Sequence, residues 1–564
     1  TLYLEFEKRR APVSFTNRES NVWRRRTSTL CLILLILIVC TNLIVPMLTL
    51  LGKSVDFSPF YAGFAEVLGS SITKQALRNS CVVTVVASLL AVCMAFFFAY
   101  VVELKVTAKR RPLFRFLAIL PMLVPSITHG LVIVYLFGKM GIVTRLTGIQ
   151  LPIYGPLGII MGSFFYAFPL AFLVLSQALI NLDGRLFETA AMLGVRPLRR
   201  FFDITLPIMK YALFSAFAVC FTMIFTDYGI PLSVGGTYSI IPLLFYKNVI
   251  GMLDFAKGAI YSTMILIPAV IVYLLDILYF SKKQVSSTRN VVPVRSGRFH
   301  PVQKLFFAVL LVMLVVPIAL ILITPFIQSW PYDMTLTFSH FARIITVGKL
   351  GSLILNSVLI ALMTGVLGTL LSLAAGYMYV RVASVPSGLK KLAHALYITS
   401  LAIPGLALGL AFAMFFRGTP IYNTIWILVI VNVMHFFGSP YMMAISHFKL
   451  LNPNLEAVCY TLGGSSLRVL LDVIIPNSRR MLLDVFVYFF TNTMVTISAV
   501  SLLYNARLTT LALQITAYSD QGMWESAVAI SLVILLINTA MKAWQSFRLN
   551  KRSSEEPLVP LGGA

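Results

Sequence analysis

The sequence predicts an all-α membrane protein with about 12 transmembrane helices, arranged as two parallel six-helix halves. Two composition features predict a membrane protein: 59% of the 564 residues are hydrophobic and only 12% are charged, whereas soluble domains are about half apolar and about one quarter charged. The third observation is the pattern along the chain, in which long apolar runs alternate with short polar segments.

The apolar runs predict the spans, because about 20 apolar residues cross a bilayer as a helix. The run that begins near Thr29 is too long for the apolar part of a signal peptide and lacks a small-residue cleavage site, so we expect it to be the first span. The twelve expected spans are 29–51, 80–103, 113–138, 156–178, 208–228, 258–281, 304–328, 353–380, 392–416, 422–447, 481–503 and 524–546.

Lysine and arginine predict the orientation of these spans. Basic clusters lie before the first span and after every second span, whereas connections such as 139–155 and 417–421 are poorer in basic residues. Because basic loops remain in the cytoplasm, we expect both termini to be cytoplasmic. The net charge of +25 therefore needs no nucleic-acid partner, since the charges flank apolar runs instead of forming one basic face.

A polar, basic segment at 282–303 is expected to be a cytoplasmic linker. It divides the chain into a cytoplasmic basic tail (1–28), a first six-helix domain (29–281), a second six-helix domain (304–546) and a second cytoplasmic tail (547–564).

The two six-helix domains repeat each other. Asn-Ser pairs at 79–80 and 356–357, and prolines that precede a glycine by five residues at 125–130 and 404–409, recur at offsets of 277 and 279. Residues 188–207 and 457–476 align without a gap at an offset of 269. Parallel repeats of this kind place a translocation site between the halves, near the membrane midplane.

The aligned stretches predict two cytoplasmic protrusions. Gly194 and Gly463 each lie thirteen residues before a proline, Pro207 or Pro476. We expect a short helix, a glycine turn and a second helix in each copy, and small residues such as Ala190 leave a low-profile helix face for the groove of a soluble partner. Amphipathic helices on the lipid headgroups are the alternative, but they do not explain the repeated glycine-to-proline spacing.

The sequence ETAAMLG at 188–194, followed by ITLP at 204–207, resembles the EAA loop of binding-protein-dependent ABC importer permeases. In the second copy Ala457 occupies the position of the family's glutamate, and Glu456 lies one residue earlier. The resemblance implies a type I ABC importer permease-like fold. It also implies that these loops are coupling helices for two ABC ATPase subunits, expected to be a homodimer, through Glu188, Ala190, Gly194, Pro207, Glu456, Gly463 and Pro476.

The resemblance further implies a periplasmic or lipid-anchored solute-binding protein and a place in the bacterial inner membrane. With its two halves fused in one chain, the protein resembles permeases for ferric iron and for 2-aminoethylphosphonate. Residues 225–251 look most like the phosphonate type.

No ATP site is expected in this chain. Gly52-Lys53-Ser54 lacks the earlier glycine of a P-loop, because Met47 stands at that position. We therefore expect a transport subunit without a cofactor, with ATP and Mg²⁺ bound by partner subunits. The six cysteines and six histidines are scattered without metal-ligand spacing, so no metal site is expected.

Polar residues inside the spans are candidates for the translocation pathway, because they are costly in lipid. Thr226 and Asp227 end the fifth span, and Thr491, Asn492 and Thr496 form a polar patch in the eleventh. Asp227 could meet the ammonium group of an aminophosphonate. For His129 and His435, hydrogen bonds between packed helices are the expected role.

Two other classes of protein remain open. An ion- or proton-coupled twelve-helix carrier would also have two six-span halves, but the segment ELKVTAKRRP after the second span lacks the Gly/Asp/Arg-rich pattern of such carriers. A membrane-embedded enzyme would need paired carboxylates, an HExxH motif or a nucleophile motif, none of which the sequence contains.

Overall fold

The computed structural model describes residues 18–56, 60–276, 278 and 300–553. Most of the expected N-terminal tail, nearly all of the linker and the end of the C-terminal tail lie outside the described residues. Within them, helices form the whole fold except for one antiparallel hairpin, β1 (Ile327–Ser329) and β2 (Asp333–Leu336). The all-α class is confirmed.

The first half follows the expected order of spans. Its elements are α2 (Arg18–Val39), η1 (Cys40–Ile44), α3 (Val45–Asp56), α4 (Phe60–Gly69), α5 (Ser71–Leu104), α6 (Arg111–Ile119), η2 (Leu120–Leu123), α7 (Ser126–Phe137), α8 (Ile142–Thr147), α9 (Pro156–Ile180), α10 (Gly184–Met192), α11 (Pro197–Arg200), η3 (Phe201–Thr205), α12 (Leu206–Phe225), α13 (Gly229–Val234), α14 (Ile241–Tyr246), η4 (Lys247–Gly251) and α15 (Phe255–Leu275).

The second half repeats this order with the hairpin added after its first span. Its helices are α16 (Pro301–Ile323), η7 (Thr324–Phe326), α17 (Ser339–Thr346), α18 (Leu350–Val380), α19 (Ser387–Ile398), η8 (Thr399–Leu401), α20 (Gly405–Phe415), α21 (Ile425–Phe436), α22 (Gly438–Leu450), α23 (Asn454–Thr461), α24 (Ser466–Arg468), η9 (Val469–Ile474), α25 (Ile475–Asn477), α26 (Arg479–Val495), α27 (Leu511–Asp520) and α28 (Trp524–Ser553).

In the described part of the chain, nine helices are long and apolar enough to span a membrane, and two bent pairs raise the number to eleven. The bent pairs are α19 with α20, at 109°, and α21 with α22, at 54°. The seventeen-residue helix α26 corresponds to the remaining expected span. The chain is therefore a multi-pass membrane protein.

Four expected spans are not continuous helices, and one of them, 422–447, divides into α21 and α22 with a bend of 54°. Residues 113–138 and 392–416 break before Pro125 and Pro404, which begin α7 and α20 as N-cap residues, because proline has no N–H and excludes the preceding residue from helical geometry. The expected span 481–503 ends early, since the helix stops at Val495 and Thr496 is extended.

The repeated Asn-Ser pairs have the same role in both halves. Asn79 donates to the carbonyl of Ser239 at 3.0 Å and Asn356 to the carbonyl of Thr509 at 3.2 Å. The following serines accept from the first N–H of a helix: Ser80 from Ile241 of α14 at 2.9 Å and Ser357 from Leu511 of α27 at 2.8 Å. Each pair therefore fastens the segment after the fifth span of its half to the second span, and satisfies a helix-end donor.

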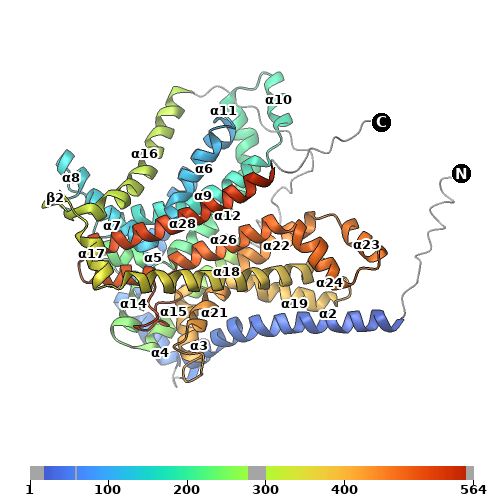
Figure 1. Ribbon diagram of the computed structural model, residues 1–564. Coiled ribbons are helices and arrows are strands. Elements are labelled where there is room, and N and C mark those ends of the chain that lie inside the picture. The colour runs from blue at the N-terminus through green and yellow to red at the C-terminus, as the bar shows by residue number, and fades with distance from the viewer. Residues whose placement is uncertain (1–17, 57–59, 277, 279–299, 554–564) are drawn as a thin grey trace.

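Each half packs its first span on the other half. In Figure 1, α2 and α3 run beside the second half, where α3 contacts α20 and α2 contacts α18 and α19. Conversely, α16 contacts α5, α6 and α7, and Phe307 stacks on Phe98 with ring centroids 4.8 Å apart. The two halves thus form one interlocked body.

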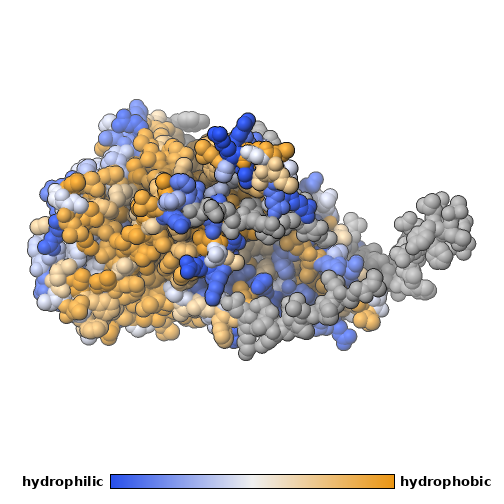
Figure 2. Space-filling view, turned by 90° about the horizontal axis from the view of Figure 1, so that it is seen from above, coloured by the Kyte–Doolittle hydropathy of each residue, from blue (hydrophilic) through white to orange (hydrophobic). Residues whose placement is uncertain are grey.

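Large apolar side chains also face outward along the spans. Figure 2 shows a broad hydrophobic area bordered by hydrophilic patches. Exposed residues on the spans include Leu30, Leu34 and Leu37 of α2 and Val82, Val86 and Leu89 of α5. An apolar surface of this extent suits contact with lipid.

Candidate functional site

Two loops at one end of the molecule carry the repeated glycine and proline. We name them loop 1 (183–207) and loop 2 (452–476). Loop 1 joins the fourth span to the fifth, and loop 2 joins the tenth to the eleventh, so both emerge at the same end of the bundle. Figure 1 shows α10 and α23 toward the right and α8, β2 and α17 at the opposite, left side.

Loop 1 has the predicted helix–turn–helix form. The Asp183 carboxylate accepts from the Arg185 N–H at 3.1 Å and caps α10. At the other end of α10, Gly194 adopts φ 70°, and the N–H groups of Gly194 and Val195 donate to the carbonyls of Ala191 and Ala190. This pair of bonds is the Schellman motif, which favours glycine at the left-handed position.

Loop 2 reproduces that geometry. Asn452 accepts from the Asn454 N–H at 3.0 Å. Gly463 adopts φ 78°, and the N–H groups of Gly463 and Gly464 donate to the carbonyls of Tyr460 and Cys459. Because a Cβ at Gly194 or Gly463 would meet no atom within 4 Å, both turns face open space. Backbone geometry therefore requires glycine there, and packing inside this chain does not.

Both loops expose large apolar side chains at matching positions. Leu193 is 76% exposed and its counterpart Leu462 is 81% exposed. The other exposed pairs at the same offset are Leu186 with Leu455, Leu198 with Leu467, and Phe202 with Leu471. Exposed apolar groups rimmed by polar ones mark surfaces that bind another protein. The sequence analysis aligned the two stretches at the offset of 269 but gave these apolar side chains no role.

The predicted loop residues lie on different faces. Ala190 is buried against its own chain, whereas Glu188 is half-buried and Ala457 is exposed. Pro207 follows the π-helical turn η3 at the start of α12, and Pro476 follows the π-helical turn η9 in α25. The small face of α10 at Ala190 therefore packs inward, and the leucines point outward.

Glu456 pairs with an arginine at the end of α18. Arg381 Nε lies 3.4 Å from Glu456 Oε1, with side chains 9% and 14% exposed, and the Arg381 guanidinium also donates to the Leu451 carbonyl. Burial raises the pKa of the Glu456 carboxyl and Arg381 offsets part of that rise. Arg381 thus holds both the start and the first turn of α23.

In the first half, the buried acid near the end of the second span has different partners. Glu103, near the end of α5, is 3% exposed. It accepts from Arg115 Nε of α6 at 2.8 Å and from the Ser176 hydroxyl of α9. This ion pair joins three spans to one another and does not reach loop 1.

The candidate pathway residues of the fifth span form local bonds. Asp227 Oδ2 accepts from the Ile230 N–H at 3.1 Å, at the start of α13, and Thr226 donates to the Met223 carbonyl at 3.3 Å. Asp227 is half-buried. It caps α13 and also contacts the Ser126 hydroxyl, at the start of α7.

The threonine–asparagine patch also bonds within its own chain segment. Thr491, Asn492 and Thr496 donate to carbonyls four residues earlier, those of Val487, Tyr488 and Asn492, at 2.7, 2.8 and 2.6 Å. Hydroxyl and amide groups that bond back in this way need no partner on another helix.

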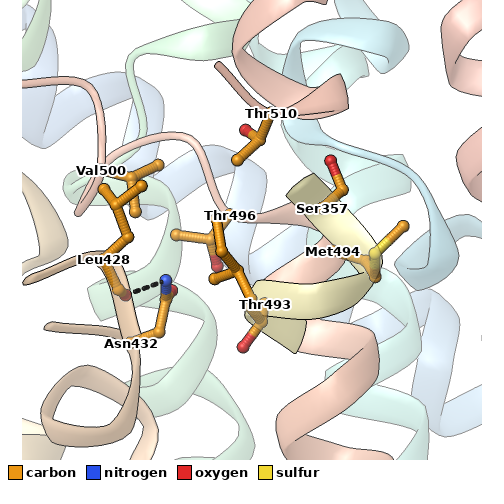
Figure 3. A pocket seen from close by; sticks show the side chains of 9 residues that line it. Ser357, Leu428, Asn432, Thr493, Met494, Thr496, Val500 and Thr510 are labelled. Carbon is orange, nitrogen blue, oxygen red and sulfur yellow. Dashed lines mark hydrogen bonds between the residues drawn. The ribbon is translucent and has the colours of Figure 1, made fainter. Parts of the chain in front are cut away.

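Only Thr496 of these candidates lines the small cavity drawn in Figure 3. The cavity brings Thr496 together with Ser357, Asn432, Thr493 and Thr510, which come from separate segments. The Thr493 hydroxyl and the side-chain amide oxygen (Oδ1) of Asn432 are buried there without a hydrogen-bond partner among the described residues. Thr226, Asp227, Thr491 and Asn492 are not among its lining residues.

The expected packing role of His129 agrees with its contact, since Nε2 lies 3.0 Å from the Pro121 carbonyl oxygen. Within the described residues, no three His, Cys, Asp or Glu side chains gather in a geometry that could hold a metal ion.

Comparison with known proteins matches two parts of the chain, residues 89–281 and 368–552, to the family described as binding-protein-dependent transport system inner membrane component. The ferric transport system permease protein FbpB of Actinobacillus pleuropneumoniae is 25% identical over 75% of this chain and 64% of its own length. An Fe(3+)-transport system permease protein FbpB 2 of Haemophilus influenzae is 20% identical over 90% of this chain and 96% of its own length.

The spermidine/putrescine transport system permease protein PotB of Haemophilus influenzae matches a shorter part, with 27% identity over 31% of this chain and 64% of its own length. Each matched segment of this chain contains one of the two loops and the spans around that loop.

Proposed function

Because the chain belongs to the family of binding-protein-dependent transport system inner membrane components, we propose that it is the membrane subunit of an ATP-driven importer of ferric iron. Both permease domains of the transporter are present in this one polypeptide, which is a multi-pass protein of the inner membrane. The observation that carries the proposal is the duplicated loop, with the same glycine turn and the same exposed leucines in each half.

The loops are suited to dock two ATPase subunits. Each loop presents a turn closed by two backbone hydrogen bonds. The apolar side chains beside this turn are exposed to water when the chain is alone. Covering such groups with a partner stabilises the complex by about 25 cal/mol for each Å² removed from water. We expect one ATPase of a homodimer on each loop, with ATP and Mg²⁺ held by those subunits.

Transport then follows from a change in the distance between the loops. ATP binding closes the ATPases and draws loops 1 and 2 together, and the interlocked spans pass this movement to the seam between the halves. ATP binding can change the conformation of the permease in this way only if the closed ATPases bind its two conformations with different affinity. In this arrangement both termini and both loops are cytoplasmic, and a binding protein delivers the solute at the end that carries α8, β2 and α17.

Ferric iron is the favoured solute because two relatives named above are ferric transport permeases. An importer of 2-aminoethylphosphonate is the second candidate, supported by the likeness of residues 225–251 to the phosphonate type. An ion- or proton-coupled carrier is not favoured, because two domains of the binding-protein-dependent family match the chain.

Reconstitution tests the proposal. The full chain is placed in liposomes with a candidate ABC ATPase and a candidate solute-binding protein from the same organism, and uptake of radioactive ferric iron or of 2-aminoethylphosphonate is measured with and without ATP. Iron uptake that requires both partners and ATP is the expected result. Uptake without ATP would support a secondary carrier, and ATP-dependent uptake of the phosphonate alone would change the assigned solute.

A further inference from the structure

A cluster of phenol and carboxylate groups joins the two halves at the end opposite the loops. The Tyr246 hydroxyl, at the end of α14, donates to Asp520 Oδ2, at the end of α27, over 3.3 Å. Tyr228 stacks on Tyr246 with ring centroids 4.8 Å apart and an interplanar angle of 20°. The Tyr504 phenol lies close enough to Tyr246 to affect it electrostatically. A phenol of one half thus bonds to a carboxylate of the other at the seam, with the Tyr228 ring stacked on that phenol and Tyr504 nearby.

The cluster leads from the surface to the interior. Tyr504 is 45% exposed and Asp520 is exposed, whereas Tyr246 is half-buried and Tyr228 is 2% exposed. The buried Tyr228 hydroxyl forms no hydrogen bond of ordinary geometry among the described residues, although the Ser501 hydroxyl lies near it. A buried hydroxyl without a full bond is costly, so it indicates a group that receives a partner in another state.

The charge at the cluster favours a cation. Asp227 and Asp520 both act electrostatically on Tyr228. Asp520 is the last residue of the ten-residue helix α27, where the backbone carbonyls add partial negative charge. These groups come from both halves, so any movement at the seam changes the distances among them.

We propose that Tyr228, Tyr246, Tyr504 and Asp520 form a transient binding site for the ferric ion at the seam. This inference rests on the proposed function and names the groups that receive the solute. Hard cations prefer oxygen ligands, and anionic oxygens suit a trivalent ion best. Tyrosine oxygen is a known ligand of iron in proteins. The mixture of exposed and buried donors suits a site that the ion enters and leaves, because conduction requires weak, successive contacts.

Binding is an exchange of protons for metal. Each phenol that coordinates iron loses its O–H proton to water as the iron–oxygen bond forms, and the hydrogen bond from Tyr246 to Asp520 is replaced by two iron–oxygen contacts. The iron remains ferric and no electron is transferred. Affinity for ferric iron is therefore expected to rise with pH.

The test uses the purified full chain in lipid nanodiscs, titrated with ferric citrate. Iron bound by phenolate absorbs visible light through charge transfer, and Ga³⁺, which has the same charge but no such band, is the control ion. Tyr246→Phe, Tyr228→Phe and Asp520→Asn are compared with Tyr332→Phe, which removes an exposed phenol from the β1–β2 turn at the same end of the molecule. Each substitution keeps the shape of the side chain, and iron uptake in liposomes is the second measurement.

We expect a visible band in the wild-type chain, and affinity for ferric citrate lower by about tenfold or more in each cluster variant, the usual scale for a perturbed metal site. Tyr332→Phe should bind as the wild type does. A wild-type chain without a band, or cluster variants with unchanged affinity and uptake, would overturn the inference. Iron uptake by the wild-type chain would leave the proposed function standing even if the inference about the cluster is overturned. ATP-dependent uptake of another solute, without iron uptake, would instead overturn the proposed function and the inference with it.

Discussion

Loops 1 and 2 share their outer geometry and differ in how the body of the protein holds them. Their glycines adopt φ 70° and 78°, and leucines are exposed at equivalent positions. In loop 2, Glu456 pairs with Arg381 at the end of a span, whereas the buried acid of the first half, Glu103, joins spans to one another. The surface offered to a partner is conserved between copies of the repeat, and the internal anchor is not.

This difference gives the displaced glutamate a physical role. Glu188 is half-buried at its position in α10, while Glu456 turns toward Arg381 and leaves Ala457 exposed at the aligned position. This anchor through Arg381 predicts that the two loops offer similar surfaces to an ATPase but respond differently when the arginine is removed. The following experiments separate these two properties.

The largest effect is expected from an aspartate at either glycine. Gly194→Asp and Gly463→Asp each place a side chain on a left-handed residue, at a cost of roughly 1–2 kcal/mol, and add a charge to the face offered to the partner. Solute uptake should collapse in both variants while the chain still inserts into the membrane. Gly418→Asp is the matched control, because Gly418 has φ 84° and open space around it but lies at the opposite end. Unimpaired uptake in both loop variants would reject the coupling role.

A smaller effect is expected from the exposed leucines. Leu193→Ser and Leu462→Ser remove apolar surface that the ATPase would cover, and burial of one leucine contributes about 1.5–3 kcal/mol. ATPase binding to the purified chain should weaken by about tenfold or more in each variant. Leu146→Ser, which changes an 81% exposed residue of α8, should bind ATPase normally. Weakening in one loop variant alone would show that the two loops are not equivalent docking surfaces.

The anchors are tested by two arginine variants. Arg381→Ala leaves a mostly buried carboxylate without its partner, which costs up to about 3–5 kcal/mol for fully buried pairs. Hydrogen exchange should become faster in α23 and stay unchanged in α10. Arg115→Ala should instead loosen the contact of α5 with α6 and α9. Equal loosening of both loops by Arg381→Ala would contradict the difference in anchoring.

The smallest effect is expected at the repeated asparagines. Asn79 makes one observed bond to the segment after the fifth span and Asn356 makes two to its counterpart. Each bond between membrane segments contributes about 0.6–2 kcal/mol. Asn356→Ala should therefore lower the melting temperature of the purified chain more than Asn79→Ala does. The reverse order would show that the hydrogen bonds do not set the stability of these connections.

Sequence reasoning found the features that depend on near neighbours. Gly194 and Gly463 could be identified from local patterns, since a helix end is specified within a few residues. The repeats also identified the Asn-Ser pairs as equivalent positions, although not what they bind. The breaks before Pro125 and Pro404 were missed because the apolar runs continue through them.

Contacts between distant segments could not be predicted in the same way. Nothing in the pattern around Arg381 identifies Glu456 as its partner, and the exchange of first spans between halves depends on packing over the whole chain. The pathway role of the threonine–asparagine patch stays a prediction, and the bonds of Thr491 and Asn492 to their own helix could not be read from the sequence. Polarity in a span identifies a costly group and does not show where that group points.

Site-specific photo-crosslinking measures the central claim most directly. A photoreactive amino acid is placed at residue 193 or 462 of the full chain, or at residue 146 as a control, in membranes that contain the ATPase and binding protein. The account predicts a crosslink to the ATPase from both 193 and 462, and none from 146. Crosslinks from 193 and 462 to lipid alone, with the ATPase present and active, would contradict it.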